Sequence, residues 1–212
     1  KKIKLIDSNM LLSNWYMLWL EKASKSFLTY QLAIDLQLSI NDIRLGFRKS
    51  YRPLVNKALK EWDTKVYEGN IDDVFEEFRL LHLEVSGKET RSRESWGIQK
   101  EQVKSNEALL VTVRDGDILI GAGFFTYTKN EGSYSIGAYK RELFDKPIAH
   151  GVQMKAIEAL KEKGCKTYHV GQKMTLLDEN VPTDKELSIS NFKEGFAGYV
   201  YAQPHLEVDL NE

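Results

Sequence analysis

Several segments of the chain repeat apolar residues at spacings of three and four, the period of a helix that buries one face. The pattern is clearest in residues 71–84, where Val74, Phe78 and Leu81 share a face and Ser86-Gly87 ends the helix. Further helices are predicted over residues 10–20, from the N-cap Ser39, from the Pro53 region to about residue 62, and over 95–102, 148–163 and 183–195.

Other segments are continuous runs of β-favouring residues. Residues 108–114 and 118–127 are two such runs, and Asp115-Gly116 between them is typical of a tight hairpin. Shorter strands are predicted over residues 27–38, 134–139, 166–170 and 198–208. The helix at 148–163 separates two strands and predicts a right-handed β-α-β crossover between parallel strands. The expected fold class is α/β (α+β): a mixed sheet with an antiparallel meander, a crossover helix and a parallel strand pair, flanked by helices.

The length of 212 residues allows one full domain with an added arm. Hydrophobic residues make up 42% of the chain and charged residues 29%, as in an ordinary globular protein. We expect residues 1–70 to be an N-terminal arm of helix, strand and basic helix, which could be the end of a missing N-terminal half. Residues 71–212 are expected to form the main domain.

Charge and cysteine content exclude several function classes. Lys and Arg number 30 against 31 Asp and Glu, so no overall positive field would hold DNA, and any polyanion site must be local. The single cysteine, Cys165, can form neither an internal disulfide nor a Cys/His metal cluster. These features favour a reducing compartment and predict no metal site.

The segment at residues 10–20 is apolar but too short to span a bilayer. We therefore expect a cytoplasmic protein without a transmembrane segment, which could lie at the inner face of the membrane. Trp15, Leu18 and Trp19 predict self-association as a homodimer or docking to a missing N-terminal half.

A set of short motifs resembles the FemAB-like branch of the acyltransferase fold called GNAT, over roughly residues 27–205. The motifs are Arg48-Lys49-Ser50-Tyr51-Arg52, Leu81-His82, Ser86-Gly87, Thr90-Arg91-Ser92, Trp96, Gly121-Ala122, Tyr139, Lys146-Pro147, His150, Gly171, Lys185-Glu186, Phe192-Lys193 and Gly195-Phe196. The order of predicted elements after residue 71 is also GNAT-like. The resemblance implies an N-acyltransferase that joins aminoacyl or acyl groups to amines on cell-wall precursors or surface sugars.

The predicted catalytic residues are His150, Tyr139 and His82. His150 begins the crossover helix, where the helix N-terminus would lower its pKa and leave a neutral imidazole able to act as base or donor. The alternative is a helix cap for His150, a half-buried structural histidine for His82 and a core aromatic for Tyr139.

The predicted binding residues are mainly cationic. Arg48, Lys49 and Arg52 offer phosphate contacts and Tyr51 a stacking ring, although a solvated helix face is the alternative. Arg91 and Ser92 lie in a polar loop that could clamp a phosphate or carboxylate, and Trp96 could line the acceptor pocket. Lys146 and Lys173 could meet a donor phosphate, and Gln153 completes the predicted binding set. Lys193, in contrast, is predicted to be a solvated lysine beside a core aromatic.

The acyl donor stays open among aminoacyl-tRNA, acyl-CoA and an acyl-carrier protein, and no bound cofactor is expected. GNAT enzymes that use CoA hold its pyrophosphate in a glycine-containing loop before the crossover helix, but residues 139–150 contain no glycine. The basic block at 44–65 could instead meet RNA or an acidic carrier protein. The acceptor would be a small molecule or envelope precursor. A non-catalytic module that binds a sugar nucleotide or a protein partner is the alternative function.

Overall fold

The computed structural model describes residues 2–6, 14–176, 178 and 180–210. The chain divides into two compact units, one of residues 1–33 and 170–212 and the other of residues 34–169. The predicted boundary between residues 70 and 71 falls inside the second unit. Residues 10–13 of the predicted first helix lie outside the described residues.

The second unit is built on a mixed sheet with the strand order β7-β6-β5-β4-β3. Strands β4 (Ala108–Asp115), β5 (Ile118–Tyr127) and β6 (Glu131–Tyr139) form the predicted antiparallel meander. Helix α6 (Ile148–Glu162) then leads to β7 (Thr167–Lys173), which pairs with β6 in parallel through Glu131 and Thr167. The meander, the crossover helix and the parallel pair are all confirmed.

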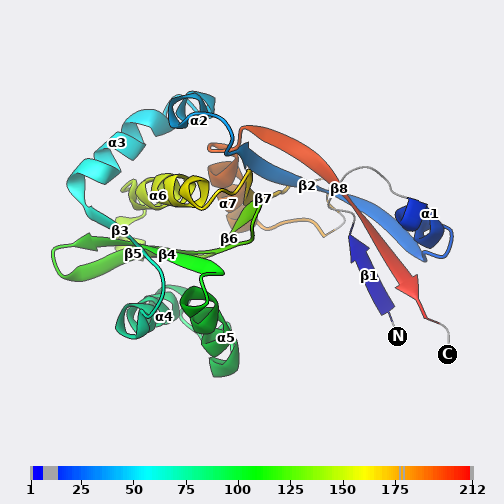
Figure 1. Ribbon diagram of the computed structural model, residues 1–212, viewed down its shortest axis with the longest axis horizontal. Coiled ribbons are helices and arrows are strands. Elements are labelled where there is room, and N and C mark those ends of the chain that lie inside the picture. Colours follow the sequence, from blue (N-terminus) through cyan, green and yellow to red (C-terminus); the bar gives the residue numbers. More distant parts are fainter. Residues whose placement is uncertain (1, 7–13, 177, 179, 211–212) are drawn as a thin grey trace. The chain divides into compact units, whose positions relative to one another are not determined.

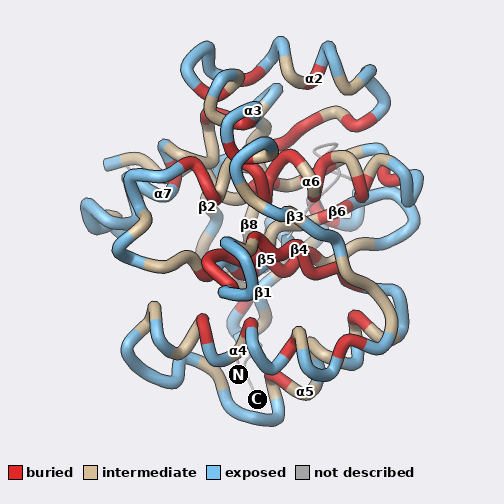
Figure 2. The backbone as a smooth tube through the Cα atoms, turned by 90° about the vertical axis from the view of Figure 1, so that its left-hand side faces the viewer, coloured by how far each residue is buried: buried red, intermediate tan, exposed pale blue. Residues whose placement is uncertain are grey.

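Helices cover both faces of the meander (Figure 1). Helix α6 packs on one face, where a Cβ atom added at Gly123 would lie 2.7 Å from Val152 Cγ1. Helices α4 (Asp72–Ser86) and α5 (Arg93–Lys104) cover the other face, where Phe124 contacts Phe75. Figure 2 shows the resulting buried stretch along β4 and β5. Burial from both sides explains why these strands are continuous apolar runs without alternation.

Helix ends in this unit follow the predicted signals. Ser39 caps α2 (Ile40–Gly46) by accepting a hydrogen bond from the Asp42 N–H, and Gly87 ends α4 with φ of 71°. Pro53 lies in the first turn of α3 (Tyr51–Glu61), where its missing N–H costs nothing. A short 3₁₀ helix, Arg141–Leu143, precedes α6.

Strand β3 (Asp63–Tyr67) is absent from the predictions because its five residues are mostly exposed and carry no apolar pattern. It pairs with β4 in an antiparallel register, from Asp63 opposite Arg114 to Tyr67 opposite Leu110. Because β3 directly follows α2 and α3, this pairing joins both helices to the meander. The second unit therefore begins at residue 34, well before residue 71.

The first unit contains an antiparallel sheet in the order β1-β8-β2. Its strands are β1 (Lys2–Ile6), β8 (Tyr199–Asp209) and β2 (Lys25–Asp35), the last of which crosses into the second unit at its end. The unit also holds α1 (Asn14–Leu20) and α7 (Asp184–Glu194), and Thr183 and Glu186 form the predicted capping box of α7. Strand β1 was not predicted, because five residues are too few to establish a period. No helix in the described part of the chain is long and apolar enough to cross a membrane.

Candidate functional site

His150 lies in the first turn of α6 and forms one group with residues of the preceding helical segment. Its ring meets the Tyr51 ring edge-on, with centroids 4.5 Å apart. The Arg48 guanidinium lies 5.2 Å from the Tyr51 ring centroid, and Arg48 Nη1 is 3.4 Å from Tyr51 Oη. The predicted residues Arg48, Tyr51 and His150 are thus brought together, and the exposed Lys49 follows Arg48 in the chain. We call these four residues the His150 group.

Burial lowers the pKa of His150 from 6.5 to about 4. The neutral imidazole was predicted, but desolvation, rather than the helix N-terminus, is the cause. An imidazole with so low a pKa is a weak base at neutral pH. It is therefore better suited to making a hydrogen bond than to holding a proton.

The low pKa of His150 predicts a specific loss of stability in acid. The unfolded chain protonates His150 near pH 6.5 and the folded protein only near pH 4, so its contribution is complete above 6.5 and is lost as the pH falls toward 4. Between pH 7 and about pH 4.5, wild type should lose about 2.5 kcal/mol more unfolding free energy than His150→Gln. Urea unfolding at both pH values measures this, and equal losses would contradict it.

Tyr139 belongs to a partly buried polar cluster on the α6 side of the sheet. Its hydroxyl lies 3.0 Å from that of Tyr134, and Tyr168 donates a hydrogen bond of 2.6 Å to Oε1 of the fully buried Gln153. Gly137 leaves room for this cluster, because an added Cβ would lie 1.9 Å from Tyr134 Oη. Burial raises the pKa of Tyr134 to about 12 and that of Tyr139 well above its usual value. Tyr139 can therefore donate a hydrogen bond but cannot serve as a base at neutral pH.

His82 lies on the opposite face of the sheet, in a group with Arg91 and Trp96. Its Nε2 is 3.4 Å from Arg91 Nη1, and its ring meets the Trp96 ring edge-on at 5.2 Å. The Arg91 guanidinium lies 5.7 Å from the Trp96 ring centroid. Burial, and then the charge of Arg91, lowers the pKa of His82. Because the sheet separates the two histidines, the structure does not bring the predicted catalytic set His150, Tyr139 and His82 into one site.

The other predicted binding residues have local partners. Ser92 caps α5 by accepting from the Ser95 N–H, and Arg52 Nη2 donates to the Leu45 carbonyl at 2.6 Å. Lys146 pairs with Asp145, and Lys173 pairs with Glu194. These contacts give each residue a structural role, and their roles in binding stay predictions.

Lys193 is the residue whose predicted surroundings differ most from those in the structure. It lies on α7 and is half-buried, not solvated, and burial lowers its pKa. Its ammonium rests on Gly171, where an added Cβ would lie 2.5 Å from Lys193 Nζ, and Gly171 has φ of 143°, which side-chain-bearing residues rarely adopt. The available signal was the glycine inside a strand, which often marks a close approach.

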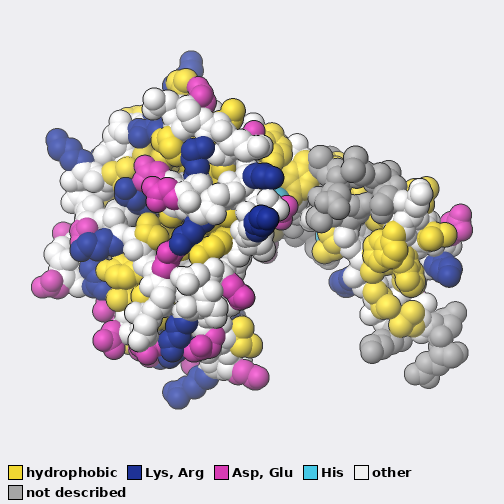
Figure 3. Space-filling view, viewed as in Figure 1, with side chains coloured by type: hydrophobic (Ala, Val, Ile, Leu, Met, Phe, Trp, Pro, Cys, Tyr) yellow, Lys and Arg dark blue, Asp and Glu magenta, His cyan; other side chains and the backbone are white. Residues whose placement is uncertain are grey.

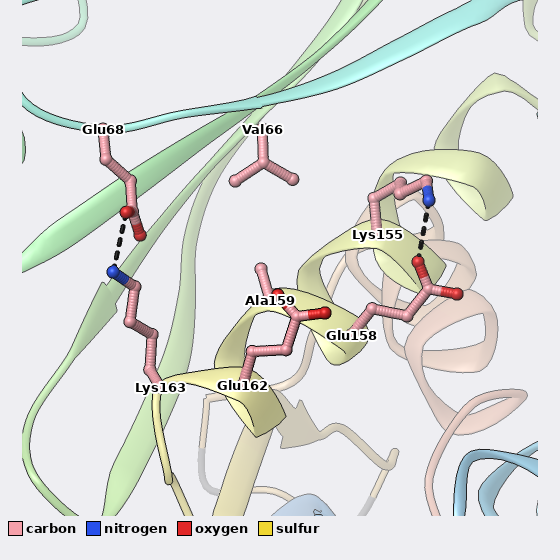
Figure 4. Close-up of a pocket in the computed structure, with 7 residues that line it drawn as sticks. All are labelled: Val66, Glu68, Lys155, Glu158, Ala159, Glu162 and Lys163. Carbon is pink, nitrogen blue, oxygen red and sulfur yellow. Dashed lines mark hydrogen bonds and ion pairs between the residues drawn. The ribbon is translucent and has the colours of Figure 1, made fainter.

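A pocket of about 440 Å³ lies between α6 and the segment that follows β3 (Figure 4). Four of the five charged side chains that line it form pairs, Glu68 with Lys163 at 2.7 Å and Lys155 with Glu158 at 2.8 Å. None of the predicted site residues lines it. Among the described residues, no three His, Cys, Asp or Glu side chains are grouped to hold a metal ion.

No family model and no curated protein matches the chain. Among solved structures, FemX matches with a TM-score of 0.71 at 15% identity, over 96% of this chain and 71% of FemX. The C-terminal domain of a putative lysylphosphatidylglycerol synthetase from Agrobacterium fabrum matches with a TM-score of 0.66 at 12% identity, over 87% of this chain and 60% of that one. L-PGS from Bacillus licheniformis matches with a TM-score of 0.65 at 15% identity, over 99% of this chain and 67% of L-PGS.

The chain has the GNAT-like fold of FemX and L-PGS. At these identities the likeness shows the fold alone. The chain spans 60% to 71% of the length of the three solved proteins.

The segment before the crossover helix differs from a loop whose backbone N–H groups hold a pyrophosphate. The Leu143, Phe144 and Lys146 backbone N–H groups donate to carbonyls within the segment, at 2.9 to 3.3 Å. The His150 N–H likewise donates to the Pro147 carbonyl at 3.0 Å. Backbone donors already used in this way are not available to a phosphate.

Proposed function

We propose that the protein transfers an aminoacyl or acyl group to the amine of a cell-envelope precursor or sugar. The observation that carries this proposal is the match to FemX and L-PGS over nearly the whole chain. In such a transfer the acceptor amine attacks the donor's ester or thioester carbonyl. The C–N bond forms, the C–O or C–S bond breaks, and the amine proton passes to the departing oxygen or sulfur.

Lys193 is our candidate for stabilising the oxyanion that develops during this attack. Its ammonium is partly removed from water, where a hydrogen bond to an oxyanion is stronger than in solvent. Gly171 and the α7 backbone fix its position without a side chain in the way. This arrangement needs no covalent intermediate.

The His150 group is our candidate for contact with the donor. Arg48 and Lys49 are exposed cations beside a neutral imidazole, a combination suited to phosphate oxygens. Tyr51 is buried, so its ring supports Arg48 and His150 and is not open to a stacked base. The engaged backbone of the segment before α6 argues against acyl-CoA and leaves aminoacyl-tRNA or an acyl-carrier protein. We place the reaction in the cytoplasm, at or near the inner face of the membrane, where envelope precursors are made.

A thermal-shift comparison at low salt tests the donor. We expect bulk tRNA at saturating concentration to raise the melting temperature by about 5 to 10 °C, and acetyl-CoA and free CoA to leave it unchanged. Lys49→Glu should reduce the tRNA effect and make it vanish at lower salt, because a phosphate contact is lost. Lys185→Glu, an exposed lysine on α7, is the matched control.

The other outcomes of this comparison are equally informative. Stabilisation by CoA would show that the argument from the segment before α6 is wrong. Stabilisation only by nucleotide-linked amino sugars, with no response to any acyl donor, would favour the non-catalytic binding module.

A further inference from the structure

Helix α1 exposes apolar side chains to solvent, unlike an ordinary helix on the surface of a folded unit. Tyr16 is its one buried residue, and the helix carries no charged side chain. Leu18 and Trp15 lie on the face away from Tyr16 and are 64% and 53% exposed, with Met17 also exposed beside them. A surface helix ordinarily presents polar residues on this side. Figure 3 shows hydrophobic side chains gathered over this helix.

Aromatic and cationic groups border this apolar face. The rings of Trp15 and Trp19 meet edge-on with centroids 6.3 Å apart. Lys22 Nζ lies 5.8 Å from the Trp19 ring centroid, and Lys25 Nζ lies 5.2 Å from that of Phe27. Glu21 is the one acid that directly follows the helix, whereas the acids Glu207 and Asp209 are paired with Lys4 and Lys2.

We propose that α1 docks the protein on an anionic membrane surface, with Trp15 and Leu18 inserted among the lipid headgroups and Lys22 at the phosphate level. Tryptophan is enriched at this depth of a bilayer, and lysine extends from an apolar face toward anionic headgroups. The helix lies on the bilayer and does not span it.

The size of the face distinguishes this occupant from a second copy of the chain. Seven helical residues extend only about 10 Å. A stable protein interface needs about 800 Å² from each partner, far more than so short a helix offers. Insertion of a few side chains into a bilayer has no such requirement.

Sedimentation with lipid vesicles tests the proposal on the full chain. We expect the protein to pellet with vesicles of phosphatidylcholine mixed with phosphatidylglycerol, and much less with phosphatidylcholine alone. The double variant Trp15→Ser/Leu18→Ser should lower the partition coefficient by roughly tenfold or more. Lys22→Glu should lower it about tenfold on the anionic vesicles only.

The control is Ile98→Ser/Ile118→Ser, which removes two apolar side chains that are each 59% exposed in the other unit. It should pellet like wild type, and all variants should keep the wild-type urea midpoint. Failure of wild type to pellet, or equal pelleting by Trp15→Ser/Leu18→Ser, would overturn the proposal. A wild-type dimer that this variant converts to a monomer would assign the face to a second copy. The inference does not rest on the proposed transfer reaction, because vesicle binding is read without turnover.

Discussion

Lys193→Met is expected to slow acyl transfer about 100- to 1000-fold with little change in stability. Removal of a preorganised donor to a developing oxyanion has effects of this size in other enzymes. Methionine keeps the length and apolar stem of lysine, so packing on α7 should survive. The measurement is kcat with the donor identified by thermal shift, alongside the urea midpoint. The loss should fall mainly on kcat, because the oxyanion exists only during the reaction.

Two further variants separate the chemistry of Lys193 from the structure around it. Lys185→Met removes an exposed lysine from the same helix and should leave kcat unchanged. Gly171→Ala keeps Lys193 but places a Cβ where its ammonium lies, so kcat should fall although the lysine is present. Normal turnover in Lys193→Met would remove Lys193 from the mechanism, and unfolding of that variant would show the residue to be structural.

Phe78→Ala is expected to lower the free energy of unfolding by about 3 to 5 kcal/mol. Phe78 is fully buried on α4 and meets the rings of Phe75 and Trp96 edge-on, at 5.9 and 5.7 Å. Removal of its ring leaves a cavity beside Trp96, the residue whose ring contacts Arg91, and the closely packed neighbours cannot fill it. Urea unfolding at neutral pH gives the value.

The matched control for Phe78→Ala is Leu80→Ala on the same helix. Leu80 is about half exposed, so its truncation should cost less than about 1 kcal/mol. A loss below 1 kcal/mol for Phe78→Ala itself would contradict the packing described here. A similar loss in both variants would also contradict it, because alanine is the better helix former and helix propensity cannot account for a loss in either variant.

The residues of the candidate site could be proposed from sequence motifs, but their contacts could not. The start of the crossover helix predicted His150 as a site residue, and the Arg-Lys-Ser-Tyr motif predicted Arg48 and Tyr51. Their contact could not be inferred, because it depends on α3 packing against α6. The placement of His82 was beyond the sequence for a different reason. Strands buried on both faces have no alternation, so the pattern does not tell which helix covers which face.

Lys193 illustrates the same limit for a single side chain. A lysine near a helix end is ordinarily exposed to solvent. Lys193 is half-buried because its ammonium lies against the backbone of Gly171. Its lowered pKa is a property of that surrounding and not of the residue.

Local periodicity, turn chemistry and the handedness of strand connections predicted the main helices, the meander and the parallel crossover. They also predicted the caps at Ser39, Gly87 and Thr183. Tertiary contacts set the pairing of β3, the division into units, the separation of His82 from His150 and the burial of Lys193. Each of these depends on contacts between residues distant in the chain, whose free energy comes from packing and desolvation that no local pattern encodes.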